Sequence, residues 1–283
     1  MIVVTGATGN VGRPLVQALA AAGIEVTAVS RNASADSFPG TGAVRHYRAD
    51  LASLGSLRPA LDGADALFLH DTGAGAQLLE VRDIFDAARA GGVGRIVLLS
   101  SQGVATRPQS ASHGGVGRSL EEAVRQSGTQ WTILRPGGFA SNAYAWADSV
   151  RTHRIAAAPF GDVGLPVIDP SDIAEVAAAA LYGDGHAGST YELTGPALST
   201  PRQRARTLAD VLGEPIAFIE QSRDEARAQM RQFMPEAVVG TTLAILGDPT
   251  PAEQRISPTT EQLLGRPART FAEWAGRNIE AFK

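Results

Sequence analysis

Three glycines near the N-terminus have the spacing of a nucleotide-binding loop. Gly6, Gly9 and Gly12 follow an apolar run in VVTGATGNVGRPLVQAL (residues 3–19), with the pattern G-x-x-G-x-x-G. Glycines at these places let the chain turn sharply, let backbone N–H groups approach a pyrophosphate, and let a helix pack closely on a strand. The N-terminus of that helix would stabilise the negative charge. The pattern therefore predicts a dinucleotide site.

The end of the second expected strand predicts which dinucleotide is bound. An acidic residue there would accept hydrogen bonds from the ribose of NAD, but the sequence reads AVSRN, with Ser30 and Arg31. A guanidinium pairs well with a 2′-phosphate. We therefore expect NADP(H) to be preferred over NAD(H), the alternative being that Arg31 is an ordinary exposed arginine. Asp50, after the third expected strand, would either accept from the adenine amino group or cap the next helix.

A glycine-rich stretch, ASHGGVGRSLEE (111–122), carries a candidate proton donor. Ser119 and Glu122 have the spacing of a capping box, and each glycine inside a helix costs about 1 kcal/mol. A helix is therefore expected to begin near residue 119, with residues 112–118 forming a loop beside the cofactor. An imidazole titrates near working pH, so His113 could donate a proton there. A solvent-facing loop histidine is the alternative.

The elements that must position these residues alternate along the first half of the chain. Strands are expected at 1–5, 24–29, 43–47, 65–70, 94–99 and 130–134, with helices near 10–22, 53–61, 75–90 and 119–127. This alternation of apolar strands and helices predicts a parallel sheet with both faces covered. The expected fold is α/β: a doubly wound Rossmann sheet with a smaller, mainly helical C-terminal lobe.

The second half is expected to be mostly helical. Helices are predicted near 172–182, 200–212, 222–232, 236–246 and 270–281. We place an NAD(P)-binding domain at 1–153 and a substrate lobe at 154–283, with 189–195 returning to the main sheet as a strand. The cleft between the two is the default place for a ligand.

Composition limits the partners that the protein can have. Its 283 residues are 44% hydrophobic and 19% charged, with a net charge of −4, which offers no basic surface for nucleic acid or anionic membranes. It has no cysteine, and its histidines lack ligand spacing with carboxylates, so no metal site is expected. The N-terminus lacks a basic signal region, and no apolar run approaches about 20 residues. We expect a cytoplasmic protein acting on a small molecule, with a homodimer as one open oligomeric state.

Several longer motifs resemble those of NmrA-like atypical short-chain dehydrogenase/reductases. They are GATGNVG, LLSSQGV (98–104), EEAVRQSGTQWTILRPGGFASN (121–142) and DPSDIAEVAAAAL (169–181). That group includes quinone oxidoreductases, triphenylmethane-dye reductases and a redox-sensing regulator. The resemblance implies a Rossmann core and a C-terminal substrate lobe, with NADP(H) bound more often than NAD(H). It leaves both enzymes and cofactor-binding regulators open.

The resemblance also assigns residues to the cofactor. It implies a phosphate loop of Gly6, Thr8, Gly9, Asn10, Val11 and Gly12, an adenosine-phosphate contact at Arg31, serines Ser100 and Ser101 at the end of the fifth strand, and a nicotinamide-side turn of Pro136, Gly137 and Phe139. Ser101 thus joins His113 as a candidate catalytic residue. An acceptor pocket could be lined by Tyr144, Trp146, Phe160, Met230 and Phe233, although each could equally be core.

The proton-transfer pair of most short-chain dehydrogenases is missing. Aligned on Glu121, the tyrosine and lysine positions fall near His113 and Gly117, and no tyrosine in the chain has a lysine four residues later. Reducing a simple ketone creates an alkoxide that must be protonated, a step to which a proton donor contributes roughly 10²–10⁴-fold. A quinone delocalises the new charge, so proximity supplies much of the rate. The expected function is NADPH-dependent hydride transfer to a conjugated acceptor; the alternative is a non-catalytic NADP(H)-binding redox sensor.

Overall fold

The chain folds into two compact units, each described here by itself. The computed structural model describes residues 1–32, 38, 44–70, 81–110 and 116–283, without the side chains of residues 81 and 116. The first unit comprises Met1–Val104, Gly114–Pro136 and Pro170–Glu192, and the second Ala105–His113, Gly137–Asp169 and Leu193–Lys283. This grouping differs from a single boundary at residue 153, because the chain passes between the units several times.

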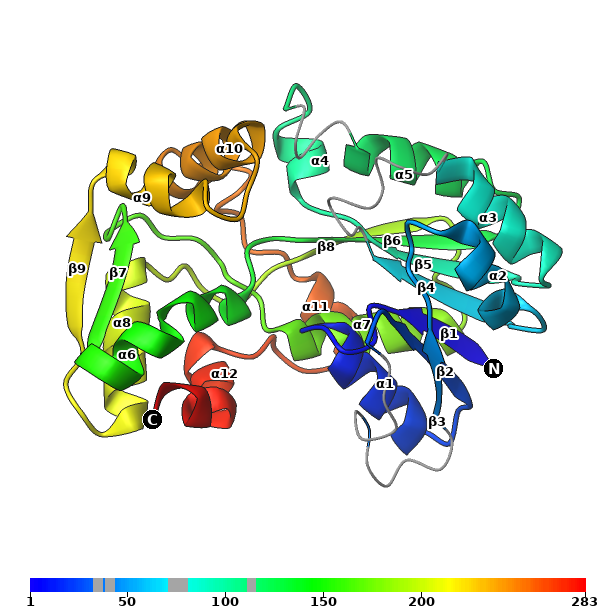
Figure 1. The fold of residues 1–283 in the computed structure, drawn as a ribbon, viewed down its shortest axis with the longest axis horizontal. Coiled ribbons are helices and arrows are strands. Elements are labelled where there is room, and N and C mark those ends of the chain that lie inside the picture. Colours follow the sequence, from blue (N-terminus) through cyan, green and yellow to red (C-terminus); the bar gives the residue numbers. More distant parts are fainter. Residues whose placement is uncertain (33–37, 39–43, 71–80, 111–115) are drawn as a thin grey trace. The chain divides into compact units, whose positions relative to one another are not determined.

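The first unit contains a seven-stranded sheet (Figure 1). Its strands are β1 (Ile2–Thr5), β2 (Val26–Ser30), β3 (Val44–Arg48), β4 (Ala66–His70), β5 (Arg95–Leu99), β6 (Gln130–Pro136) and β8 (Ser189–Leu193). They lie in the order β3-β2-β1-β4-β5-β6-β8, and the neighbouring pairs among β1–β6 are parallel. This is the Rossmann arrangement expected from the sequence, with the strand expected at 189–195 at the sheet's edge. The strand order reverses between β1 and β4, and such reversals create ligand crevices at the carboxyl ends of the strands.

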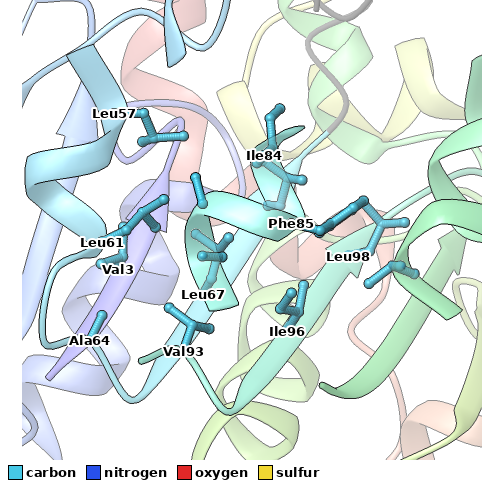
Figure 2. Packing of buried hydrophobic residues seen from close by; sticks show 14 of the residues in the cluster. Val3, Leu57, Leu61, Ala64, Leu67, Ile84, Phe85, Val93, Ile96 and Leu98 are labelled. Carbon is cyan, nitrogen blue, oxygen red and sulfur yellow. The ribbon is translucent and has the colours of Figure 1, made fainter. Parts of the chain in front are cut away.

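Helices cover both faces of this sheet. They are α1 (Gly12–Ala21), α2 (Leu54–Leu61), α3 (Val81–Ala90), α5 (Val116–Arg125) and α7 (Pro170–Tyr182). Helices α1 and α7 pack together on one face, and α2, α3 and α5 lie side by side on the other (Figure 1). Figure 2 shows the core beneath α2 and α3, where strand residues such as Leu67 and Ile96 meet Leu61 and Phe85. All four are almost fully buried, which explains why the strands read as continuous apolar runs.

Helix α5 begins earlier than the sequence predicted. It starts at Val116, so Ser119 lies inside the helix and the expected start near 119 is wrong. Gly117 explains the difference: a Cβ there would lie 2.6 Å from Cγ2 of Val104, closer than real Cβ atoms approach. The absence of a side chain lets α5 pack tightly beside the segment after β5. Tertiary packing therefore outweighs the low helix propensity of glycine.

The second unit is mainly helical and carries a small sheet that was not predicted. Its elements are η3 (Ala140–Trp146), α6 (Ala147–His153), β7 (Ile155–Pro159), α8 (Pro201–Leu212), β9 (Ala217–Gln221), α9 (Arg223–Met230), α10 (Glu236–Gly247), α11 (Thr259–Leu264), α12 (Phe271–Asn278) and η4 (Ile279–Phe282). Strands β7 and β9 pair in parallel. The short helix α4 (Gly103–Thr106) joins the two units along the chain. In the described part of the chain, no helix is long and apolar enough to cross a membrane.

Candidate functional site

The loop between β1 and α1 requires glycine for two different reasons. Gly6 has a φ of +59°, a left-handed conformation, and a Cβ there would lie 2.5 Å from Cε1 of His70. Gly12 opens α1 so close to the loop that a Cβ would collide with the carbonyl oxygen of Gly6. The Gly9 N–H donates to that same carbonyl at 2.9 Å, which closes the turn. Glycines are thus needed for the loop to pack closely against the N-terminus of α1.

The N-terminus of α1 fits an anionic ligand. Its N-cap is Val11, and no side chain caps the helix. Thr8, Gly9 and Asn10 are exposed, while the Ala7 N–H donates to the Val29 carbonyl at 3.1 Å and fixes the loop to β2. The first N–H groups of a helix lack partners within the helix and favour negative charge. The loop therefore fits a diphosphate.

The adenosine end of the predicted site lies at the ends of β2 and β3. Arg31 directly follows β2 and is exposed, and no ion pair joins it to any residue that the structure describes. The Asp50 carboxylate accepts from the Ala52 N–H at 3.0 Å. Helix α2 instead begins after its N-cap Ser53, so the suggestion that Asp50 caps this helix is wrong. A guanidinium is left available for a phosphate at this edge.

Two serines follow β5 and have different hydrogen-bond partners. The Ser100 hydroxyl donates to Oε1 of Glu121 at 2.7 Å. The Ser101 hydroxyl oxygen accepts from the Gly103 N–H at 3.1 Å. Backbone bonds from Ser100 to Leu134 and from Gln102 to Pro136 then hold this segment beside the end of β6. Both serines are therefore fixed at the carboxyl edge of the sheet, together with Pro136.

Glu121 lies at the centre of a buried ionic network. Its side chain is 1% exposed and accepts from Arg135 through both carboxylate oxygens, from Nε at 2.8 Å and from Nη2 at 2.6 Å. Arg125, one turn further along α5, donates to Oε2 at 3.0 Å. Burial alone would raise the pKa of Glu121, but hydrogen bonds from Arg135 and Ser100 and the charge of Arg135 outweigh it and lower the pKa. The same pairing raises the pKa of Arg135.

The remaining predicted cofactor residues lie in the second unit. Gly137 donates its N–H to the Leu193 carbonyl at 2.9 Å, and Phe139 forms an isolated parallel bridge with Ile168. These two contacts hold the backbone directly after β6 in an extended conformation. His113 falls outside the described residues.

The five predicted pocket residues fall into separate places within the second unit. Tyr144 packs near Trp274 and Phe282 and donates to Oδ1 of Asn278 at 2.5 Å. Trp146 is buried in the same cluster and donates its indole N–H to the Ala157 carbonyl. Phe160 and Met230 pack with Val239 and Leu243 in a smaller cluster, and Phe233 is 67% exposed. These side chains do not form one continuous lining.

A groove of about 400 Å³ in this unit has other walls. It is lined by residues 106–110 and by Gly240, Thr241 and Ala244 of α10. Ion pairing fixes the first wall, because both Nε and Nη2 of Arg107 lie 2.8 Å from the buried Glu253 carboxylate. Hydrogen bonding from Arg107 and from the Thr250 backbone lowers the pKa of Glu253 despite its burial, which alone would raise it.

Two residues of the site, His70 and Glu121, were not predicted from the sequence to belong to it. His70 ends β4 and lies against Gly6, where Thr5 Oγ1 approaches its Nδ1 at 3.3 Å. Its place at the end of a strand beside the glycine loop is the signal that could have identified it. Glu121 served only to align the sequence, and nothing in the sequence indicates that Ser100 would be its partner. Among the described residues, no group of three or more acidic or histidine side chains could hold a metal ion.

Comparison with known proteins agrees with this geometry. The NAD(P)H-binding family matches residues 6–183. The chain is 38% identical to a (4-alkanoyl-5-oxo-2,5-dihydrofuran-3-yl)methyl phosphate reductase of Streptomyces griseus, covering 100% of this chain and 99% of the relative. It is 30% identical to an NAD(P)H azoreductase of Xenophilus azovorans, covering 100% and 99%.

A solved structure of similar fold is the NADPH-dependent quinone oxidoreductase of Escherichia coli in complex with NADPH. It is 25% identical to this chain and has a TM-score of 0.78, with 99% of this chain and 100% of the other covered. The glycine loop, the strand order and these full-length matches lead to one assignment. The chain belongs to the NAD(P)H-binding family.

Proposed function

We propose that the protein is an NADPH-dependent reductase that transfers hydride to a conjugated small-molecule acceptor, such as a quinone. The observation that carries the proposal is the edge of the sheet at β5, which offers two serine hydroxyls and a buried carboxylate held by arginine. A Cβ at Gly117, near the expected lysine position, would lie 2.6 Å from Cγ2 of Val104, so a side chain fits there only if Val104 moves. An acceptor that delocalises its new charge needs less proton donation than a simple ketone.

The named relatives support this class of acceptor. An unsaturated lactone phosphate, an azo compound and a quinone appear in the names of the three proteins compared above. Each contains a conjugated system that hydride can enter. The unsaturated lactone is the acceptor of a relative that matches this chain over its full length.

Each part of the chain has a role in the proposed reaction. The uncapped amides of α1 bind the diphosphate, and Arg31 binds the 2′-phosphate that distinguishes NADP(H) from NAD(H). When bound, NADPH supplies the hydride, and a proton from solvent or a side chain completes the reduction. The Ser101 hydroxyl at the end of β5 stabilises the negative charge that develops on the acceptor.

A panel of acceptors tests the proposal. Purified protein is mixed with NADPH and, separately, with a para-quinone, an azo dye, a 2,5-dihydrofuran-2-one and cyclohexanone, and absorbance is followed at 340 nm. We expect turnover of at least one conjugated acceptor and none of cyclohexanone. Loss of absorbance no faster than without protein for every conjugated acceptor would contradict the proposal.

The same protein sample separates an enzyme from a sensor. The missing tyrosine–lysine pair is the observation that favours a non-catalytic sensor. Such a sensor would discriminate between NADPH and NADP⁺ in a calorimetric titration and turn over no acceptor. We expect turnover.

A further inference from the structure

The two serines after β5 differ in the hydrogen bonds that remain open to them. A serine hydroxyl has one hydrogen to donate and two lone pairs that accept. Ser100 donates its hydrogen to Glu121, so only its lone pairs remain for a ligand. Ser101 already accepts from the Gly103 N–H, and its hydrogen has no acceptor among the described residues. The neighbouring hydroxyls are therefore set up with opposite polarity.

Glu121 fixes this polarity because it must stay ionised. An ionised carboxylate accepts hydrogen bonds and donates none. Both of its oxygens receive N–H groups from Arg135, and Oε2 also receives Arg125. Two guanidinium groups around one carboxylate favour its charged form over the protonated one. The Ser100 hydroxyl must therefore be the donor in its contact with Glu121.

We propose that Glu121 is a positioning residue that takes the Ser100 hydrogen, so that Ser100 accepts from an N–H or O–H of the bound cofactor and Ser101 donates to the acceptor. The inference rests on the proposed hydride transfer, because only a reaction that builds negative charge needs a donor at that place. The two serines therefore have separate duties: Ser100 contributes to cofactor affinity and Ser101 to the rate.

Glu121→Gln is expected to reverse the role of Ser100. The introduced amide nitrogen at the Oε2 place would face N–H groups from both Arg125 and Arg135. At the Oε1 place it would face one arginine N–H and the Ser100 oxygen, which can accept. The second arrangement is less repulsive. Ser100 then accepts from the amide and turns its own hydrogen toward the ligand.

A double-mutant cycle on NADPH affinity tests the role of Glu121. We expect Ser100→Ala and Glu121→Gln each to raise the Kd of NADPH by about 3- to 10-fold, the usual effect of one hydrogen bond. The double variant should be no weaker than Ser100→Ala alone, because Glu121 acts through Ser100. Ser100→Thr keeps the hydroxyl and should restore affinity. Glu122→Gln, the same change at the exposed neighbouring position of α5, is the matched control and should leave Kd unchanged.

Kinetics at saturating NADPH test the division of duties. With a para-quinone, Ser101→Ala should lower kcat about tenfold or more, the effect of losing a donor to developing charge, with an unchanged Kd for NADPH. Ser100→Ala should change kcat less than about threefold. Equal losses of kcat in the two variants would overturn the inference, as would Kd effects of Ser100→Ala and Glu121→Gln that multiply.

The two arms of the experiment keep the inference separate from the proposed function. If the unmodified protein reduces no quinone or other conjugated acceptor, the proposed function fails, while the affinity cycle still decides whether Glu121 acts through Ser100. If Glu121→Gln does not fold, rescue by Ser100→Thr relative to Ser100→Ala decides the role of the hydroxyl. A Kd that Ser100→Ala leaves unchanged would overturn the assignment of Ser100 to the cofactor.

Discussion

At the scale of single residues, the site depends on a few side chains whose charge or size is tightly constrained. The sequence predicts the glycines of the β1–α1 loop and Arg31 as cofactor contacts, because their spacing and their place after a strand carry the signal. The network around Glu121 could not, since a carboxylate in a helix reads as an ordinary surface residue. Its burial arises from β6, which brings Arg135 beside it. Such contacts become visible only after the strands are placed.

Arg31→Asp tests the basis of cofactor preference. A carboxylate at the end of β2 would repel the 2′-phosphate and could accept from a ribose hydroxyl, so NADPH should bind about 10- to 100-fold more weakly and NADH within about threefold of the parent. Calorimetry or fluorescence titration measures both constants. Arg58→Asp, on the exposed surface of α2, makes the same change in net charge and is the control. Equal losses for both cofactors would place Arg31 away from the phosphate.

Buried carboxylates predict how stability depends on pH. The pKa of Glu121 and that of Glu253 are lowered in the folded protein, so the unfolded chain binds more protons near the ordinary glutamate pKa of about 4.5. Their stabilisation is present above that value and is lost as the pH falls through the folded pKa. Urea unfolding at pH 7, 5 and 4 should show falling stability, and Glu253→Gln should make the fall shallower. Glu280→Gln, in an exposed pair with Lys283, should not.

At the scale of elements, the capping-box pattern marks the start of a helix at three places and fails to do so at a fourth. Thr200, Ser222 and Thr270 each form a capping box that starts a helix. Ser119 has the same spacing before Glu122 but lies inside α5, because packing at Gly117 carries the helix three residues further back. Strands β7 and β9 were missed for a different reason. They pair across about sixty residues of chain, and no short-range pattern reports such a partner.

Two helical glycines, Gly240 and Gly117, should respond to alanine in opposite directions. In α10, Gly240 has nothing within 4 Å of a Cβ, so Gly240→Ala should stabilise the protein by about 1 kcal/mol through helix propensity. In α5, Gly117→Ala gains the same propensity but forces a Cβ against Val104, and overpacking typically costs about 1–3 kcal/mol. We expect a net loss of about 1 kcal/mol. Urea denaturation of the two variants compares them directly, and equal shifts would show that α5 can move away freely.

At the scale of the whole molecule, the alternation of strands and helices was enough to predict the parallel sheet, and the matched family confirms its Rossmann class. The assignment of segments to units was harder. Residues 137–169 follow β6 directly, yet they group with the C-terminal residues. Burial decides this grouping, because Ala143, Trp146 and Val150 belong to the cluster that contains Trp274. No sequence pattern identifies which distant helix a short apolar run will meet.

A fragment cut at the boundary expected from sequence tests this grouping. Residues 154–283 keep β7 and β9 but lose η3 and α6, and with them Trp146 and Val150. Removing large core side chains typically costs about 3–5 kcal/mol each, comparable to the stability of a small domain. We expect the fragment to lack a cooperative thermal transition and near-ultraviolet circular dichroism. A cooperative transition would show that residues after 153 fold independently.

The close contact between Gly117 and Val104 also limits how the enzyme could evolve. A lysine installed at that place would first have to displace the Val104 side chain. A proton relay built on a tyrosine–lysine pair would therefore also need a smaller residue in place of Val104. Substitutions that change which compounds the protein reduces need no such paired replacement.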